Sequence, residues 1–138
     1  MLARAAAADV FVAAAAVADW TPAVPADRKL KKHEGAPRLE LAATPDILAA
    51  VAALPRAPFT VGFAAETADL EANARAKLDR KGVDLVAAND VGGGAVFDAD
   101  DNELLVLWRG GERRLARAPK PALARALVAL IAERFGQR

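Results

Sequence analysis

Three short runs of apolar residues, at 10–15, 59–63 and 83–88, recur along the first part of the chain. Each run is apolar at most of its successive positions, which is typical of a strand that is buried on both faces of a parallel sheet. The intervening segments, 44–54 and 67–81, carry apolar residues at helical spacing. This strand–helix–strand–helix–strand order predicts an α/β fold with a mostly parallel sheet.

The helix over 44–54 has the clearest start signal. Thr44 is expected to cap it, Pro45 to take its first position, and Asp46 to favour the positive end of the helix dipole. Pro55 should stop it, because proline disfavours a helical conformation in the residue before it.

The next helix is expected to begin at Thr67 or Asp69 and to end at Gly82. Beyond it, three glycines at 92–94 mark a change of pattern, and short antiparallel strands are predicted at 95–98, 103–108 and 113–116, with turns at 100–102 and 110–111. A last helix begins at Lys120-Pro121. Its buried stripe is predicted to consist of Leu123, Leu127, Leu130 and Ile131.

The remaining segments have weaker patterns. Residues 2–8 are predicted to be the end of a helix, and residues 20–27, which hold two prolines, to be a loop. Residues 29–32 and 38–42 are predicted to be two extended arms on either side of a turn.

Composition narrows the class of protein. A chain of 138 residues is expected to form one domain. The net charge of +1 argues against a nucleic-acid partner, since such proteins carry a strong basic excess. The apolar run at 10–18 is too short to span a membrane, and Asp9 interrupts any signal peptide, so the expected location is the cytoplasm.

The chain has no cysteine and no serine, and His33 is its one histidine. These absences exclude disulfides, thiol and serine nucleophiles and cysteine metal sites, and they argue against a histidine zinc site. The three glycines at 92–94 lack the spacing of a dinucleotide-binding loop.

Polar residues follow the ends of the predicted parallel strands. Asp19, the residues after Phe63, and Asn89-Asp90 should converge on one crevice, because ligands bind at the carboxyl ends of strands in such sheets. Asp19 suits a ribose hydroxyl or a magnesium ion, or it is simply a turn former. The small residues at 13–16 allow a ligand to approach closely, or they only fill a tight sheet.

Lysines are the second candidate group. Lys29, Lys31 and Lys32 repel one another unless they are solvated or paired with an anion, so they form either a phosphate-neutralising arm or a solvated charge run. Lys77 and Lys81 lie four residues apart on one face of a predicted helix, and their stems should lie along the protein body. The amides at the start of the helix over 44–54 are a weak anion site.

Taken together, these segments resemble one family. The resemblance rests on Ala14-Ala15-Ala16-Val17-Ala18-Asp19-Trp20, Lys29-Leu30-Lys31-Lys32, Thr44-Pro45-Asp46-Ile47-Leu48, Val61-Gly62-Phe63-Ala64-Ala65-Glu66-Thr67, Lys77 through Lys81, and Val86-Ala87-Ala88-Asn89-Asp90-Val91. In this order and spacing they are similar to the phosphopantothenate–cysteine ligase (phosphopantothenoylcysteine synthetase) domain of the bacterial bifunctional coenzyme A biosynthesis proteins. The resemblance covers essentially the whole chain.

The resemblance implies a Rossmann-like three-layer fold and a two-step reaction. The carboxylate of phosphopantothenate attacks the α-phosphate of CTP, and the amine of cysteine then displaces CMP. Mg²⁺, with Asp19 as its candidate ligand, would neutralise the triphosphate, and Lys29 would be a catalytic lysine on a mobile flap. The CTP site would be lined by Ala13, Ala14, Ala15, Asp19, Lys29, Pro45, Asp46, Ile47, Leu48, Phe63, Lys77 and Lys81.

The resemblance also implies a homodimer, in which residues 95–117 contribute to pairing. FMN belongs only to the decarboxylase domain that precedes the ligase domain in this family. The family's opening strand and its Asn-x-x-Ser-Gly-like loop have no counterpart here, so residues 1–138 are expected to be the C-terminal part of the domain.

The alternatives are a truncated, non-catalytic module that binds nucleotide or dimerises, and a different nucleotide-binding enzyme such as a dehydrogenase. The missing Gly-x-Gly-x-x-Gly motif counts against the dehydrogenase.

Overall fold

The computed structural model describes residues 2–31, 35, 38–92 and 99–138. The chain divides into two compact units, one formed by Met1–Ala14 with Ile47–Arg138 and the other by Ala15–Asp46. Lys32, His33 and the strand that was predicted at 95–98 lie outside the described residues. No helix in the described ranges is long and apolar enough to cross a membrane.

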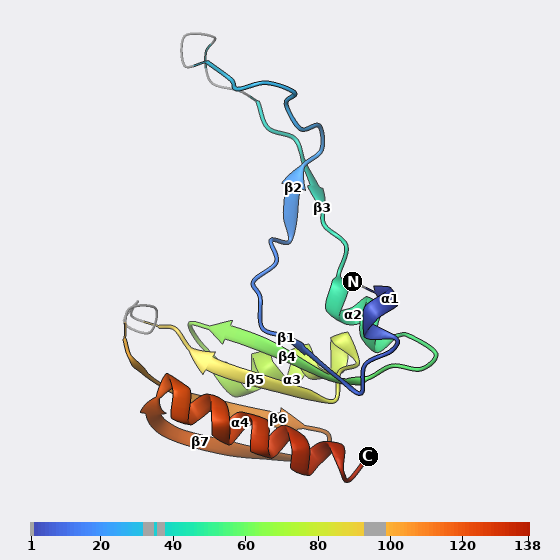
Figure 1. Cartoon of the computed structure of the whole chain (residues 1–138). Helices are drawn as coiled ribbons and strands as arrows, with labels where there is room; N and C mark the ends of the chain where they lie inside the picture. Colours follow the sequence, from blue (N-terminus) through green and yellow to red (C-terminus); the bar gives the residue numbers. More distant parts are fainter. Residues whose placement is uncertain (1, 32–34, 36–37, 93–98) are drawn as a thin grey trace. The chain divides into compact units, whose positions relative to one another are not determined.

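The first unit is built on a five-stranded sheet with the order β1-β4-β5-β6-β7 (Figure 1). Its strands are β1 (Val10–Ala13), β4 (Phe59–Glu66), β5 (Leu85–Asp90), β6 (Asp101–Trp108) and β7 (Gly111–Pro119). β1, β4 and β5 are parallel, and β6 and β7 add an antiparallel pair. The predicted fold class, a mostly parallel sheet with an antiparallel edge, is confirmed.

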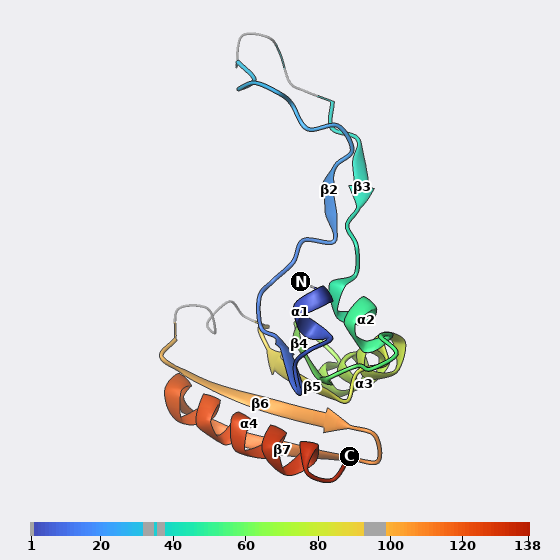
Figure 2. The same cartoon turned by 45° about the vertical axis from the view of Figure 1, so that its right-hand side comes forward.

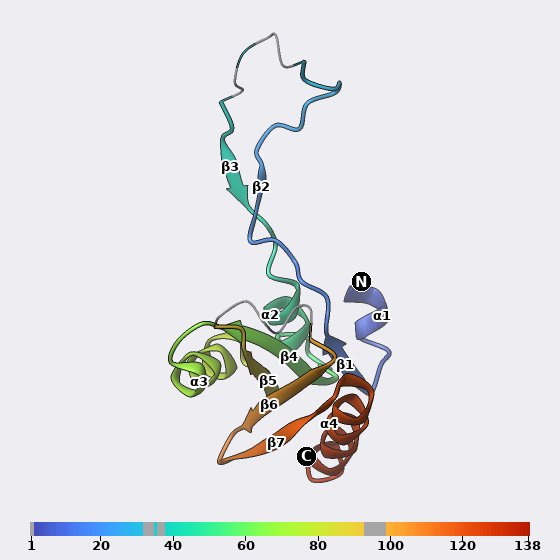
Figure 3. The ribbon, with the colours of Figure 1, turned by 90° about the vertical axis from the view of Figure 1, so that its left-hand side faces the viewer.

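Helices cover both faces of this sheet, which makes three layers (Figure 3). On one face lie α2 (Ile47–Ala52) and α3 (Leu70–Lys81), with α1 (Leu2–Ala5) against α2. On the other face, α4 (Lys120–Phe135) packs against β6 and β7.

A hydrophobic cluster fills the space between the sheet and each helical layer. The α4 side includes Val61, Leu85 and Val106 together with all four residues of the predicted α4 stripe. The α3 side includes Ala64, Leu78, Val86 and Leu107. Because apolar residues of β4 and β5 enter both clusters, these two strands are buried on both faces, as their continuous apolar pattern predicts.

β1 does not follow the prediction of a buried strand. It is an edge strand of the described sheet, and Val12 is 43% exposed. An apolar run marks a strand as suitable for burial, but its neighbours in the fold decide whether burial occurs. β4 and β5 run further than predicted, to Glu66 and to Asp90, because they stay paired through Glu66↔Asp90.

The second unit contains one antiparallel ribbon (Figure 2). The prediction of a loop over 20–27 is wrong for its first residues, since β2 (Trp20–Pro22) pairs with β3 (Leu41–Ala43). Pro22 is compatible with this position because it lies at the end of a short ribbon, where a missing N–H costs little. The end of the predicted arm at 38–42 therefore pairs with β2, through Leu41↔Pro22 and Ala42↔Thr21.

Thr44 does not cap α2. Its hydroxyl donates instead to the carbonyl oxygen of Ala18, and its N–H donates to the carbonyl oxygen of Asp19 at 2.9 Å. The helix begins three residues later, at Ile47. A threonine can bond to any nearby carbonyl oxygen, and here it closes the base of the ribbon.

The other helix boundaries are close to prediction. α3 follows Asp69, which has φ 49°, and ends at Gly82, whose φ of 65° is the left-handed conformation that favours glycine. The turn that was predicted at 100–102 is wrong in part, because Asp101 and Asn102 belong to β6. Gly110, with φ 81°, forms the turn between β6 and β7.

An ion pair joins β7 to α4 and gives a prediction for pH dependence. The Glu133 carboxylate accepts hydrogen bonds of 2.8 and 3.0 Å from the Arg113 guanidinium, and these bonds lower the pKa of Glu133 below its ordinary value of 4.5. The ion pair should therefore stabilise the fold above pH 4.5 and lose its effect as the pH falls through the lower folded-state pKa.

Urea unfolding at a series of pH values checks this. Wild type should be slightly more stable than Glu133→Gln at neutral pH, because an exposed pair contributes little. The difference should shrink as the solution is acidified below pH 4.5. A difference that stays constant across that range would contradict the assignment.

Candidate functional site

The carboxyl ends of β1, β4 and β5 lie at one edge of the sheet, because the three strands are parallel. Two backbone contacts hold the end of this edge. The Val91 N–H donates to the carbonyl oxygen of Glu66 at 2.8 Å, and the Gly92 N–H donates to the Asp90 carboxylate at 2.7 Å. The expected convergence of the ends of β4 and β5 is confirmed.

Lys77, on α3, contacts β4 near the end of β1. Its side chain is half-buried, and its Nζ donates a hydrogen bond of 2.6 Å to the backbone carbonyl oxygen of Phe63 on β4. Phe63 is one residue beyond the last β1–β4 pair and three residues before the end of β4. Lys81 follows one turn later and is also half-buried.

The ring of Phe63 lies on the opposite side of the sheet from Lys77. Successive side chains of a strand alternate between its faces, and the ring packs against the α4-side cluster, whereas α3 covers the other face. Lys77 and Phe63 meet only through the Phe63 carbonyl. The part of Phe63 that faces the lysine is therefore its backbone.

Leu48 is placed beside the same strand segment. It lies on α2 and packs against the α3-side cluster. A Cβ atom added at Gly62, the residue before Phe63, would lie 2.7 Å from Leu48 Cδ2. Gly62 is paired in register with Ala13 of β1, so two small residues lie side by side where α2 meets the sheet. The sequence analysis did not single out Gly62, although a lone glycine inside an apolar strand is a signal of close approach.

The structure thus groups a subset of the predicted residues in the first unit. These are Ala13, Ile47, Leu48, Phe63, Lys77 and Lys81, with Ala14 directly after β1.

The other candidates belong to the second unit, which holds Ala15, Asp19, Lys29, Pro45 and Asp46. Asp19 and Lys29 are exposed there. Thr44 ties the backbone at Asp19 to the segment that holds Pro45, so these two candidates are neighbours within the ribbon unit.

Among the described residues, no group of three or more histidine, aspartate or glutamate side chains is arranged to hold a metal ion. A single exposed carboxylate, such as that of Asp19, fits a magnesium ion that is also held by substrate phosphates, because Mg²⁺ is commonly bound through one or two carboxylates and phosphate oxygens.

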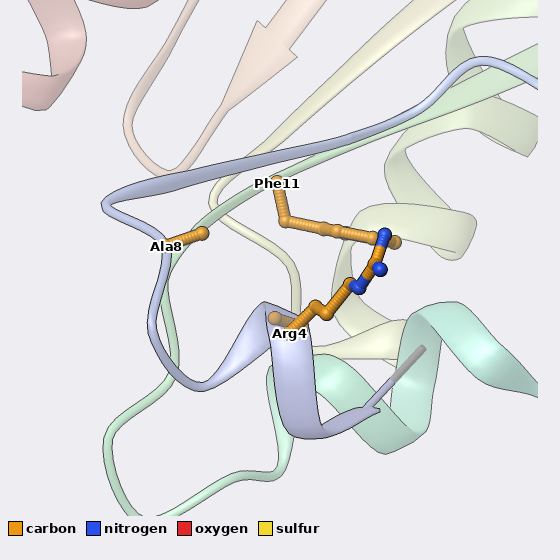
Figure 4. Close-up of a pocket in the computed structure, with 4 residues that line it drawn as sticks. Arg4, Ala8 and Phe11 are labelled. Atoms are coloured by element: carbon orange, nitrogen blue, oxygen red, sulfur yellow. The ribbon is translucent and has the colours of Figure 1, made fainter.

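The first unit also has a pocket of about 470 Å³ (Figure 4). It is lined by Arg4 and Ala5 of α1, by Ala8, and by Phe11 of β1. None of the predicted site residues lines it, so this pocket does not define the candidate site.

Comparison with known proteins identifies relatives of the chain. Residues 1–135 match the family model described as the DNA/pantothenate metabolism flavoprotein C-terminal domain. The coenzyme A biosynthesis bifunctional protein CoaBC of Vibrio cholerae is 47% identical over 130 residues, which are 91% of this chain and 33% of that protein. The CoaBC protein of Haemophilus influenzae is 43% identical over 127 residues, again 91% of this chain and 32% of that protein.

Solved structures agree with these relatives. The crystal structure of the C-terminal domain of CoaBC superposes with a TM-score of 0.72 at 27% identity, covering 94% of this chain and 56% of that domain. A Streptococcus pneumoniae flavoprotein of DNA/pantothenate metabolism, 23% identical, shares the fold with a TM-score of 0.71 over 96% of this chain and 64% of its own.

The chain spans about a third of the length of its curated relatives. The family model, however, covers nearly all of it, and the resemblance seen in the sequence is confirmed. The chain belongs to the DNA/pantothenate metabolism flavoprotein C-terminal domain family.

Proposed function

We propose that this chain is the nucleotide-binding part of a CTP-dependent phosphopantothenate–cysteine ligase. The observation that carries the proposal is the Lys77 ammonium, which lies 2.6 Å from the Phe63 carbonyl oxygen, one residue beyond the carboxyl end of the β1–β4 pairing. Ligands of open α/β sheets bind at the carboxyl ends of the strands. The relatives named coenzyme A biosynthesis bifunctional proteins support the choice of reaction.

In this proposal the carboxylate of phosphopantothenate attacks the α-phosphate of CTP, forms an acyl-cytidylate and releases pyrophosphate. The amine of cysteine then attacks the acyl carbon, and CMP leaves as the amide forms. Lys77 and Lys81 face the triphosphate, whose negative charge an ammonium group stabilises without reorganisation. The segment Pro45 to Leu48 and the backbone at Phe63 line the nucleotide.

Mg²⁺ would be held by Asp19 together with the phosphates and would supply charge neutralisation. The contribution of the first unit is then to orient the nucleotide with Lys77 and Lys81. We also propose a homodimer, to which the antiparallel β6–β7 region contributes; size-exclusion chromatography with light scattering measures this directly.

The proposal is tested by incubating the complete natural protein with CTP, phosphopantothenate, cysteine and Mg²⁺. We expect phosphopantothenoylcysteine, CMP and pyrophosphate in equal amounts. Binding of CTP without any product would favour the alternative of a non-catalytic nucleotide-binding module. Absence of CTP binding would contradict both.

Lys29→Gln separates the two steps of the reaction. If Lys29 acts in the second step, the variant should form the acyl-cytidylate and release pyrophosphate but convert the intermediate to the amide at least about 100-fold more slowly, which is the usual cost of losing one transition-state donor. Rapid-quench analysis with labelled CTP measures both steps. Lys31→Gln, two residues away, is the control, and normal amide formation by Lys29→Gln would refute the role.

A further inference from the structure

The contact between Gly62 and α2 is closer than ordinary packing of a helix on a sheet. The site where a Cβ would stand at Gly62 is 2.7 Å from Leu48 Cδ2 and 3.9 Å from Leu48 Cγ. Real Cβ atoms do not approach carbon this closely, so a side chain at position 62 requires the Leu48 Cδ2 methyl group to move, whereas Leu48 Cγ is at an ordinary contact distance. Gly62 is itself buried, so the methyl group has to move within a packed core.

Backbone conformation does not require this glycine. The glycines at positive φ are Gly35, Gly82 and Gly110 among the described residues, and Gly62 is not one of them. An alanine at position 62 can therefore adopt the same strand geometry. What glycine provides here is space for Leu48, in the first turn of α2.

The same strand segment also fixes Lys77. The carbonyl of Phe63, which follows Gly62, accepts the Lys77 ammonium hydrogen bond. Two adjacent residues of β4 thus contact two helices: Gly62 leaves room for Leu48 of α2, and the Phe63 carbonyl binds the α3 lysine.

We infer that Gly62 is a positioning residue for the nucleotide: it leaves room for Leu48, so that the first turn of α2 and the Lys77 ammonium, both in the first unit, contact the same nucleotide. The inference rests on the proposed function, because it takes these groups to line the CTP site. Its physical basis is that a shift of about 1 Å in a binding group can cost as much as 100-fold in rate.

Gly62→Ala in the complete protein should raise the KM for CTP about tenfold or more and leave the KM for cysteine unchanged. The second substitution, Leu48→Val, removes the δ carbons that the new methyl group meets. In the double variant the KM for CTP should be lower than in Gly62→Ala alone, a non-additive result that direct coupling of the two residues requires.

Gly111→Ala is the matched control. Gly111 is also a strand glycine without positive φ, and a Cβ there would lie 2.7 Å from Trp108 Nε1. Its clash is equally close but lies on β7, whose partner in the sheet is β6. This variant should lose stability and keep the wild-type KM for CTP.

Hydrogen exchange without nucleotide gives a second readout. Amides of α2 should exchange faster in Gly62→Ala than in wild type and slow again in the double variant. The inference is overturned if Gly62→Ala keeps the wild-type KM, if Gly111→Ala raises it equally, or if adding Leu48→Val to Gly62→Ala fails to lower it. If the wild-type protein does not bind CTP, the proposed function itself is wrong. This result is seen before any variant is made, so it is distinct from a failure of the inference about Gly62.

Discussion

Replacing Lys77 with methionine should lower kcat/KM for CTP by about 100-fold, the usual cost of removing one preorganised charged donor. Methionine keeps most of the length of the half-buried stem and removes only the ammonium group. The hydrogen bond to the Phe63 carbonyl is lost as well. That single bond contributes only about 1 kcal/mol to stability, so the variant should remain folded.

The measurement is steady-state kinetics in the complete protein, with urea unfolding as the check on the fold. Arg80→Met is the matched control, because Arg80 is an exposed cation on the same helix. It should keep kcat/KM within about twofold, as is usual for surface substitutions. Equal losses in the two variants would mean that the general charge of α3 matters and not the placement of Lys77.

The largest effect on stability is expected at Asp84, which lies between α3 and β5. Its carboxylate oxygen Oδ2 accepts the N–H of Thr60 at 2.7 Å and the hydroxyl of Thr60 at 2.9 Å. Thr60 is 1% exposed, so water cannot replace these bonds. Asp84→Ala leaves two buried donors without an acceptor and should cost about 3 kcal/mol of unfolding free energy.

Thermal unfolding should show this as a midpoint roughly 10 °C lower, given the size of the chain. Asp84→Asn is the informative comparison, because its amide oxygen still accepts both bonds. It should cost only about 1 kcal/mol, since the loss of charge weakens the bonds without orphaning the donors. If the asparagine variant is as unstable as the alanine variant, the negative charge matters more than hydrogen bonding. The nearby Arg138, 3.7 Å from the other carboxylate oxygen, would then be the partner to examine.

The sequence predicts a residue's position best where that position depends on its own element alone. Lys77 and Lys81 are four residues apart on a helix, so their common face follows from helical geometry. The prediction that Thr44 caps α2 failed because its hydroxyl group bonds to a distant segment. Its sequence neighbours favour a cap, but a carbonyl oxygen 26 residues away competed for the same hydroxyl.

The importance of Gly62 could not be read with confidence from its own segment. A glycine in a strand indicates that something approaches closely, but the approaching group, Leu48, is on another element. The environment of the Phe63 ring also depends on other elements. Strand alternation places its ring on the face opposite Gly62, yet only the packing of α3 and α4 decides which of those faces the lysine shares.

The sequence by itself determined the order of strands and helices, the double-sided burial of β4 and β5, and the family, because these follow from apolar spacing and from short motifs read along the chain. Only the tertiary structure decided that β1 is an edge strand, that Trp20–Pro22 pairs with Leu41–Ala43, and that Lys77 binds the backbone of Phe63. Burial, strand pairing and side-chain partners depend on residues that are distant in sequence. A local pattern states what a segment can bury or bond, and the folded chain selects its partner.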